Sequence, residues 1–323
     1  MSAGTEVVVP WGQRKITHAF HDIDGTHSLI RDWVPVMELV IGWVIENGID
    51  GIDSQDSFIA KILSARKTCY PMAKDFAIES AGLSALTQME WALRNALKQG
   101  TLMWKGRPLP PVSLKINDLI IAQIFAGKEH SDEYGESMPF KTFLRETSSK
   151  LFKVYEQVLL IMSRNQNLKA ARSDPERWRV PGSMSFLQKL KSLDIKNYFV
   201  TGAVVEHNAD GSTSGTMYEE IVALGYQIGE RKLVEKLCGS DWNQKVSKQE
   251  IFDQICVKEG LAPENIMIIG DGRSEISAGQ QMGALTISRL NKSAARQRTL
   301  HRKLGTNLII ADYCSAELMQ IFS

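Results

Sequence analysis

A long interval of helical pattern separates one strand-like segment from all the others and constrains the fold of this chain most. It runs from Leu29 to Arg179, and its apolar residues recur at helical spacing. The two clearest stripes are Trp33, Val36, Val40, Trp43 and Val44, and Leu144, Leu151, Tyr155, Val158 and Leu159. An interval this long cannot be a plain loop in a compact domain. We therefore predict an inserted all-helical domain at 29–178, with a proline-rich turn at Pro108, Pro110 and Pro111.

Short apolar runs with the character of buried parallel strands lie on both sides of this interval, mostly after it. They are Ile16–His21, Asn197–Thr201, Ile266–Gly270, Ala284–Ser288 and Leu308–Ala311. Helix-like segments alternate with the later runs, at Met184–Leu193, Thr216–Leu224 and Lys248–Glu259. This alternation, with right-handed crossovers, predicts an α/β core with a Rossmann-like, doubly wound parallel sheet, formed by residues 1–28 and 179–323.

Composition and charge narrow the classes of partner. The chain has 323 residues, 43% of them hydrophobic, which is enough for one large core and a smaller one. Its 38 Lys and Arg balance 37 Asp and Glu, so neither nucleic acid nor an anionic membrane is favoured, and small molecules are the expected ligands. We interpret one basic cluster as a solvated helix face: Arg289, Lys292, Arg296, Arg298, Arg302 and Lys303.

The cysteines and the N-terminus bear on cellular location. The cysteines are scattered, without zinc-site spacing, and indicate neither a disulfide framework nor a zinc site: Cys69, Cys238, Cys256 and Cys314. The chain begins without a basic, then apolar, leader, and no stretch approaches the ~20 apolar residues that span a bilayer. We expect a soluble cytoplasmic protein. The apolar helical stripes could serve a homodimer interface as easily as a core.

The first strand-like run ends in His21-Asp22-Ile23-Asp24-Gly25-Thr26. Two carboxylates and a glycine turn thus stand at the carboxyl end of a strand, where open α/β sheets bind ligands. Residues two apart can point the same way, so Asp22 and Asp24 can converge on one reacting group, with one attacking and the other moving protons. Taken alone, the segment also fits an ordinary Asp-Gly turn with a second acid nearby.

Later strand ends carry three further groups of chemical interest. Thr201-Gly202 offers a hydroxyl and a backbone amide suited to phosphate oxygens. Asp271 ends another strand and Glu275 follows it, and such hard oxygen ligands suit Mg²⁺. Lys245 or Lys248, at the start of the helix-like segment upstream of the third strand-like run, could reduce the repulsion between a carboxylate and a phosphate dianion. Individually, each also fits a strand threonine, a turn acid or a surface lysine.

In chain order, Asp-x-Asp-Gly-Thr, Thr-Gly, Lys and Gly-Asp-x-x-x-acid resemble the four-motif signature of the haloacid dehalogenase superfamily. The resemblance covers Ile16–Ser28 and Pro181 to the C-terminus. The helical interval matches the family's habit of inserting a cap domain after the first motif. The resemblance implies a Mg²⁺-dependent phosphatase that hydrolyses a small-molecule phosphomonoester through an aspartyl-phosphate on Asp22.

The resemblance also implies roles for individual residues. Asp22 is the expected nucleophile and a metal ligand, and Asp24 the general acid and base, with its backbone carbonyl on the metal. Asp271 is expected to complete the metal site, with Glu275 as a direct or indirect partner. The remaining roles concern the phosphoryl group: Thr201 and the Gly202 amide hold its oxygens, and Lys248 neutralises its charge.

Other readings within and outside the family stay open. The family's dehalogenases lack the second aspartate, so Asp24 favours phosphoryl chemistry. Phosphomutases keep both aspartates, and a phosphomutase or phosphotransferase of the same superfamily is the alternative function. A non-catalytic phospho-ligand-binding protein would predict the loss of Asp22 or Asp24, and both are present. Sugar phosphates, nucleotides and phosphorylated metabolic intermediates all remain candidate substrates.

Several positions depart from the family pattern or carry no assigned role. Glu275 replaces the more usual aspartate, and Lys248 lacks a following proline, so Lys245 is an alternative to it. His27 stands where an apolar residue is common, and could face substrate or be a plain hinge residue. A loop before the proline turn could reach a substrate or simply be exposed, and it carries Trp104, Lys105 and Arg107.

Overall fold

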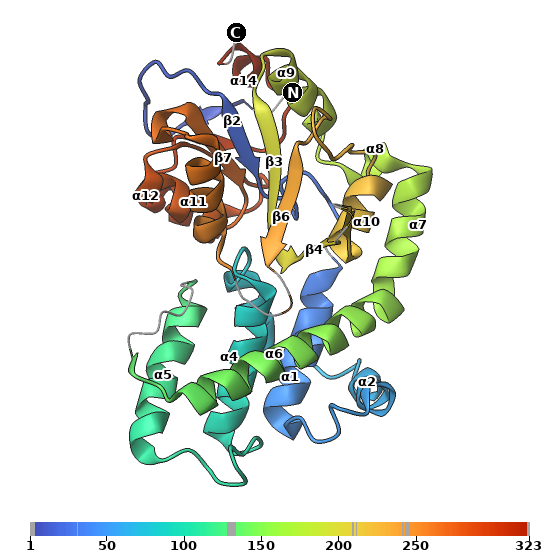
Figure 1. Ribbon diagram of the computed structural model, residues 1–323. Coiled ribbons are helices and arrows are strands. Elements are labelled where there is room, and N and C mark those ends of the chain that lie inside the picture. The colour runs from blue at the N-terminus through green and yellow to red at the C-terminus, as the bar shows by residue number, and fades with distance from the viewer. Residues whose placement is uncertain are drawn as a thin grey trace. The chain divides into compact units, whose positions relative to one another are not determined.

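The computed structural model describes residues 4–30, 32–127, 134–208, 210, 212–240, 242 and 246–321 (Figure 1). The chain divides into two compact units. The first comprises Met1–Arg31, Gln166–Asp241 and Val246–Ser323, and the second comprises Asp32–Asn165 with Trp242–Lys245. Within the part of the chain that is described, no helix is both long and apolar enough to cross a membrane.

The first unit is built on a seven-stranded sheet, taken over the described residues. In spatial order its strands are β1 (Glu6–Val7), β9 (Leu308–Ile310), β8 (Leu285–Arg289), β7 (Ile266–Gly270), β2 (His18–His21), β3 (Lys196–Val204) and β6 (Lys236–Ser240). Only the pairing of edge strand β1 with β9 is antiparallel, and the other pairs are parallel. From β2 the chain builds outward through β3 to β6, then returns to β7 and builds through β8 to β9. The order therefore reverses between β2 and β7 (Figure 1), and ligands bind at such a point in open α/β sheets.

Alternating residues of β2 show how both faces of the sheet are covered. Ala19 packs in one apolar cluster with Phe186, whereas Phe20 packs in another with Phe252. Both β2 residues are fully buried, as expected for a strand inside a parallel sheet with helices on both faces. The helices of this unit are α7 (Asn165–Ser173), α8 (Pro175–Trp178), α9 (Ser183–Ser192), α10 (Thr216–Ala223), α11 (Lys248–Glu259), α12 (Arg273–Met282), α13 (Ala295–Leu304) and α14 (Ala316–Gln320). A separate hairpin pairs β4 (Glu206–His207) with β5 (Thr213–Ser214).

The second unit contains only helices among its described elements. They are α1 (Trp33–Asn47), α2 (Gln55–Ser64), α3 (Pro71–Glu79), α4 (Ala85–Gln99), α5 (Pro111–Phe125), α6 (Met138–Leu159) and the π-helical turn η2 (Leu160–Arg164). The apolar stripe predicted for α1 is buried at Val36, Val40 and Val44, and that predicted for α6 at Leu151 and Val158. The predicted fold class, a doubly wound α/β core with an all-helical insertion, is confirmed.

The boundaries between the two units lie close to the predicted ones, at 31/32 and at 165/166. Leu168 and Ala171 of α7 pack in the α/β unit, so this unit includes Gln166–Trp178, which the sequence analysis placed in the helical segment. Compact units need not be domains that fold alone, and the division into 1–28 with 179–323 and 29–178 stays a prediction.

Candidate active site

Two carboxylates stand at the carboxyl ends of the two central strands. Asp22 follows β2 and Asp271 follows β7, and the paired residues His21 and Ile269 bring these two ends level. The backbone N–H of Asp22 donates to the carbonyl of Ile269 at 2.8 Å, which continues the ladder by one residue. The sheet thus places Asp22 and Asp271 side by side at the point where the strand order reverses.

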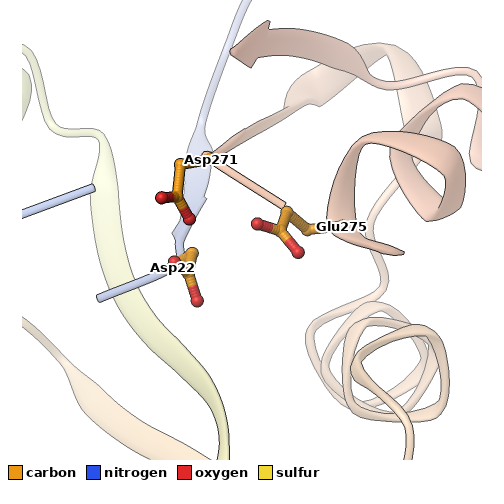
Figure 2. Close-up of side chains that lie close together, drawn as sticks. All are labelled: Asp22, Asp271 and Glu275. Atoms are coloured by element: carbon orange, nitrogen blue, oxygen red, sulfur yellow. The ribbon is translucent and has the colours of Figure 1, made fainter. Parts of the chain in front are cut away.

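Glu275 joins these two acids from the first turn of α12. One carboxylate oxygen from each of Asp22, Asp271 and Glu275 lies within 4.8 Å of the others (Figure 2). The Glu275 carboxylate is fixed by the backbone N–H of Gly272, 2.7 Å from Oε1, and by the hydroxyl of Ser274, 2.8 Å from Oε2. A cluster of hard oxygen donors of this kind suits Mg²⁺.

Gly270 creates the space in which Glu275 lies. A Cβ atom at position 270 would stand 2.2 Å from Cγ and 2.3 Å from Oε1 of Glu275. Real Cβ atoms do not come this close to other atoms, so a side chain at position 270 would push Glu275 out of its place beside the end of β7. Gly270 therefore provides the extra room that a glutamate at position 275 needs compared with an aspartate.

Lys248 lies among these acids. Its ammonium donates to Asp22 Oδ1 at 2.6 Å and to Glu275 Oε2 at 3.1 Å, and the side chain is buried. It is the first residue of α11, whose start is fixed by a reciprocal hydrogen-bond pair between Ser247 and Glu250. The alternative lysine, Lys245, lies outside the described residues.

Burial and charge act in opposite directions on these groups. Burial raises the pKa of Asp22 above its usual value, and the nearby Lys248 only partly opposes this. Burial would also raise the pKa of Glu275, but Lys248, Ser274 and the Gly272 amide lower it below the usual value. Burial would lower the pKa of Lys248, but Asp22 and Glu275 more than reverse this and raise it. One ammonium facing three acids leaves a site that favours a further cation.

The segment after Asp22 is a tight turn. It places the hydroxyl of Thr26 next to the second carboxylate oxygen of Asp22. The hydroxyl of Thr26 donates to Asp22 Oδ2 at 3.1 Å. The backbone N–H groups of Thr26, His27 and Ser28 all donate to the carbonyl of Ile23, and Gly25 adopts a positive φ of 76°. Asp24 lies within this turn, two residues beyond Asp22 and at the same edge of the sheet.

Arg289 supports the same turn from β8. Its Nη1 donates to the carbonyl of Gly25 at 2.7 Å, and its Nε donates to the carbonyl of Ala311 at 3.0 Å. The predicted solvated helix face is therefore wrong for Arg289, which ends a strand and is buried. Arg298 and Arg302 do lie on α13, where both pair with Glu6.

Thr201 and Gly202 lie in an irregular part of β3. Because His21 pairs with Phe199, Asp22 is level with Val200, and Thr201 stands one residue further along. The hydroxyl oxygen of Thr201 accepts from the N–H of Ala203 at 3.1 Å. The pairing of β3 with β6 shifts between Val200 and Val204. Such a bulge is a common way to redirect groups next to a site.

The structure shows the surroundings of His27 and of the loop at 104–107, to which the sequence assigns no single role. His27 is fully buried, with its ring nitrogens 3.0 Å from His21 Nδ1 and 2.7 Å from Ser183 Oγ, so it does not reach a solvent-exposed surface. In the helical unit, Trp104 and Arg107 close a turn through mutual backbone bonds, and the Lys105 ammonium lies 4.7 Å from the centroid of the Trp104 ring.

Sequence reasoning assigned no role to three residues that contact the site. Thr26 lies inside the first motif, and its spacing of four from Asp22 was available as a signal. Ser274 precedes Glu275 directly, so its contact was equally local. Arg289 had no such signal, because its contact with Gly25 joins residues 264 positions apart in the chain.

Comparisons with known proteins find similarity only at the level of solved structures. No family model and no curated protein matches the chain. One similar structure is a haloacid dehalogenase family hydrolase from Deinococcus radiodurans R1, with 12% identity over 95% of this chain and 94% of that one, and a TM-score of 0.45. Another is a β-phosphoglucomutase from Clostridium difficile, with 13% identity over 95% and 96%, and a TM-score of 0.45.

A third similar structure is a predicted phosphoglycolate phosphatase from Haemophilus somnus 129PT, with 16% identity over 97% of this chain and 100% of that one, and a TM-score of 0.45. Similarity at this level assigns neither an activity nor a substrate to this chain. The roles of its residues rest on the geometry of the first unit.

Proposed function

We propose that this chain is a Mg²⁺-dependent phosphatase of the haloacid dehalogenase superfamily that hydrolyses a small-molecule phosphomonoester through an aspartyl-phosphate on Asp22. The observation that supports this most is the arrangement around Asp22. Its carboxylate lies between Lys248 and Thr26, beside the acids Asp271 and Glu275, at the point where the strand order reverses. Asp22 is thus oriented by two hydrogen bonds, as a nucleophile must be, beside a cluster of acids that could bind a cation.

In the first step, a carboxylate oxygen of Asp22 attacks phosphorus while the bond from phosphorus to the ester oxygen breaks. The departing alkoxide takes a proton from Asp24, which acts as general acid. Lys248 offsets part of the repulsion between the Asp22 carboxylate and the phosphate dianion. Mg²⁺ held by Asp22, Asp271 and the backbone carbonyl of Asp24, with Glu275 alongside, would supply further charge neutralisation.

In the second step, Asp24 takes a proton from water, and the resulting oxygen attacks phosphorus of the aspartyl-phosphate. The bond from phosphorus to the Asp22 oxygen breaks, which releases inorganic phosphate and restores both aspartates. Thr201 and the Gly202 amide would hydrogen-bond the phosphoryl oxygens in both steps, and such preorganised donors lower the barrier.

We further propose that the helical unit acts as a cap that restricts the substrate to small molecules, and that the protein works in the cytoplasm. Sugar phosphates, nucleotides and small phosphorylated acids are the substrate classes to test. A phosphomutase of the same superfamily keeps both aspartates, so it is the alternative that the assay must separate.

The test is phosphate release from a panel of these three classes, with Mg²⁺ and with a chelator, for wild type and Asp22→Asn. The matched control is Asp253→Asn, because Asp253 is an exposed acid on α11, the helix that carries Lys248. Mg²⁺-dependent release by wild type and the control, absent in Asp22→Asn, is the expected result. Transfer of phosphate between positions of one sugar without net release would instead indicate the mutase. Release that survives in Asp22→Asn would contradict the proposed nucleophile.

A further inference from the structure

A chain of buried polar side chains lies beneath the candidate active site. His21 Nε2 lies 3.1 Å from Asn197 Oδ1, and His21 Nδ1 lies 3.0 Å from His27 Nε2. His27 Nδ1 lies 2.7 Å from Ser183 Oγ, which also bonds the hydroxyl of Tyr226. All five residues are buried, and each of them bonds another member of this chain of side chains.

The positions of the hydrogens along this chain follow from one end. The side-chain amide of Asn197 donates to the carbonyls of Leu187 and Leu233, so its Oδ1 is the acceptor and His21 Nε2 carries hydrogen. The Nδ1 of a neutral His21 must then accept, and His27 Nε2 must donate to it.

The same logic continues to the other end. His27 Nδ1 accepts from the hydroxyl of Ser183, whose oxygen is then free to accept from Tyr226. Every link has one donor and one acceptor, so the chain has a single direction from Tyr226 to Asn197. A second proton on His21 would place two donors against each other at the link between the rings and break it, whereas the rotating hydroxyls of Ser183 and Tyr226 could accommodate one on His27 Nδ1.

The central link closes the base of the catalytic turn. His21 is the last residue of β2, and His27 follows Thr26. The bond between their rings therefore joins the two ends of the segment 22–26, which carries both aspartates and the hydroxyl that contacts Asp22. Tyr313 reinforces this closure, since its hydroxyl donates to the carbonyl of Thr26 at 3.1 Å and its ring stacks on His27 at 5.1 Å.

We propose that His27, acting through its hydrogen bond to His21, is a positioning residue that sets the orientation of the Asp22 carboxylate for attack on phosphorus. This proposal rests on the proposed function. This role differs from a purely structural one in what it requires at position 27. Positioning requires a side chain that donates a hydrogen bond to His21 and so holds the two ends of the turn together, whereas packing requires only a ring of similar size.

The variants His27→Phe and His27→Gln separate these two roles. Phenylalanine keeps the ring that stacks on Tyr313 but removes the hydrogen bonds of the imidazole to His21, to Ser183 and to the Tyr313 hydroxyl. Glutamine keeps a donor near Nε2 and also offers an acceptor. The matched control is His18→Phe, because His18 is a buried histidine at the opposite end of β2, stacked on Tyr198.

The primary readout is kcat and KM for phosphate release, with the free energy of unfolding measured on the same samples. We expect His27→Phe to lower kcat by about 10- to 100-fold at nearly constant KM, because small misplacements of a reacting group cost this much. His27→Gln should recover most of the loss, and His18→Phe should lose stability without losing kcat. A His27→Phe protein that loses only stability, as the control does, would overturn the proposal.

Nitrogen NMR of the histidine rings supplies a readout that does not depend on activity. Wild type should show His21 and His27 as neutral rings with hydrogen on Nε2, and His27→Phe should change the His21 signals. Hydrogen on Nδ1 of either ring would overturn the chain itself. If wild type releases no phosphate from any compound while the ring signals are as expected, the proposed function fails, the positioning role falls with it, and the hydrogen-bond chain stands as structure.

Discussion

A basic side chain is buried among several acids in each unit of this protein, Arg94 in the helical unit and Lys248 in the α/β unit, and the two clusters differ in how the charges are held. In the helical unit, Arg94 grips Glu136 through two parallel bonds of 2.8 Å, and also donates to Glu90 and Asn117. In the α/β unit, Lys248 donates to Asp22 and Glu275, with the third acid Asp271 beside them.

The difference lies in geometry as well as in charge. A guanidinium presents a rigid fork that locks carboxylates in place, whereas an ammonium is a compact charge that leaves carboxylate oxygens available to another cation. The Arg94 cluster sits on helices α4 and α5 and just before α6, and the Lys248 cluster sits at strand ends where the sheet order reverses. We infer that the first cluster serves the fold and the second serves chemistry.

The largest expected effect is on stability, from Arg94→Met. Removing the guanidinium leaves Glu90 and Glu136 buried without it, and breaking a buried pair in this way costs about 3–5 kcal/mol. The free energy of unfolding in urea should fall by that amount, while kcat per folded molecule stays unchanged. Arg145→Met is the matched control, because Arg145 is exposed on α6. A loss of kcat at full stability would break the comparison.

Lys248→Met should act mainly on turnover when Mg²⁺ is saturating, because the bound cation would offset the charge of the acids that lose the ammonium. Loss of a preorganised charge at the reacting group lowers kcat by about 10²- to 10³-fold. Steady-state kinetics with saturating Mg²⁺ would measure this, beside Lys258→Met, since Lys258 is exposed on the same helix. If Lys248→Met and Lys258→Met had the same kcat, Lys248 would serve the fold, as Arg94 does, and not the chemistry.

Mg²⁺ should stabilise the protein through the second cluster. A ligand that binds only the folded state adds about 2.7 kcal/mol at a hundred times its dissociation constant. The thermal midpoint should therefore rise with Mg²⁺ in wild type and Asp253→Asn, and should not rise in Asp271→Asn. An unchanged rise in Asp271→Asn would place the cation elsewhere.

The smallest expected effect is on the pH dependence of stability, through the two buried histidines of the α/β unit. Burial lowers the pKa of His27 well below its usual value and that of His21 to about 3. Because the unfolded chain then binds more protons below pH 6.5, stability should fall as pH falls from there, by at most about 1.4 kcal/mol per pH unit for each histidine. Urea unfolding at pH 7.5 and 5 should show a smaller loss in His27→Phe than in wild type. An equal loss would mean that other groups carry the pH dependence.

Much of the fold followed from local pattern. The strand β7 and the helix α11 have the predicted bounds, because continuous apolar runs and a Ser247 to Glu250 capping pair are short-range signals. The strand β6 was missed, since Lys236-Leu237-Cys238-Gly239-Ser240 is short and contains a polar start and a glycine. β1 was also missed, because two residues at a sheet edge carry almost no pattern.

The candidate site divides in the same way. The order of motifs placed Asp22, Lys248, Asp271 and Glu275 in one site, and the structure brings these four side chains together. The contact of Arg289 with Gly25 depends on how β8 lies in the sheet, which no local pattern encodes. The histidine chain likewise depends on Asn197 and Ser183, both remote in sequence from His21.

Reductive trapping of the enzyme during turnover would test the central claim most directly. Borohydride reduces an acyl phosphate on aspartate to homoserine, so peptide mass spectrometry can locate the residue that carries phosphate. With a substrate found in the panel, homoserine is expected at position 22 only, and only when substrate and Mg²⁺ are both present. Homoserine at another acid, or an unmodified Asp22 in an enzyme that is turning over, would contradict the account.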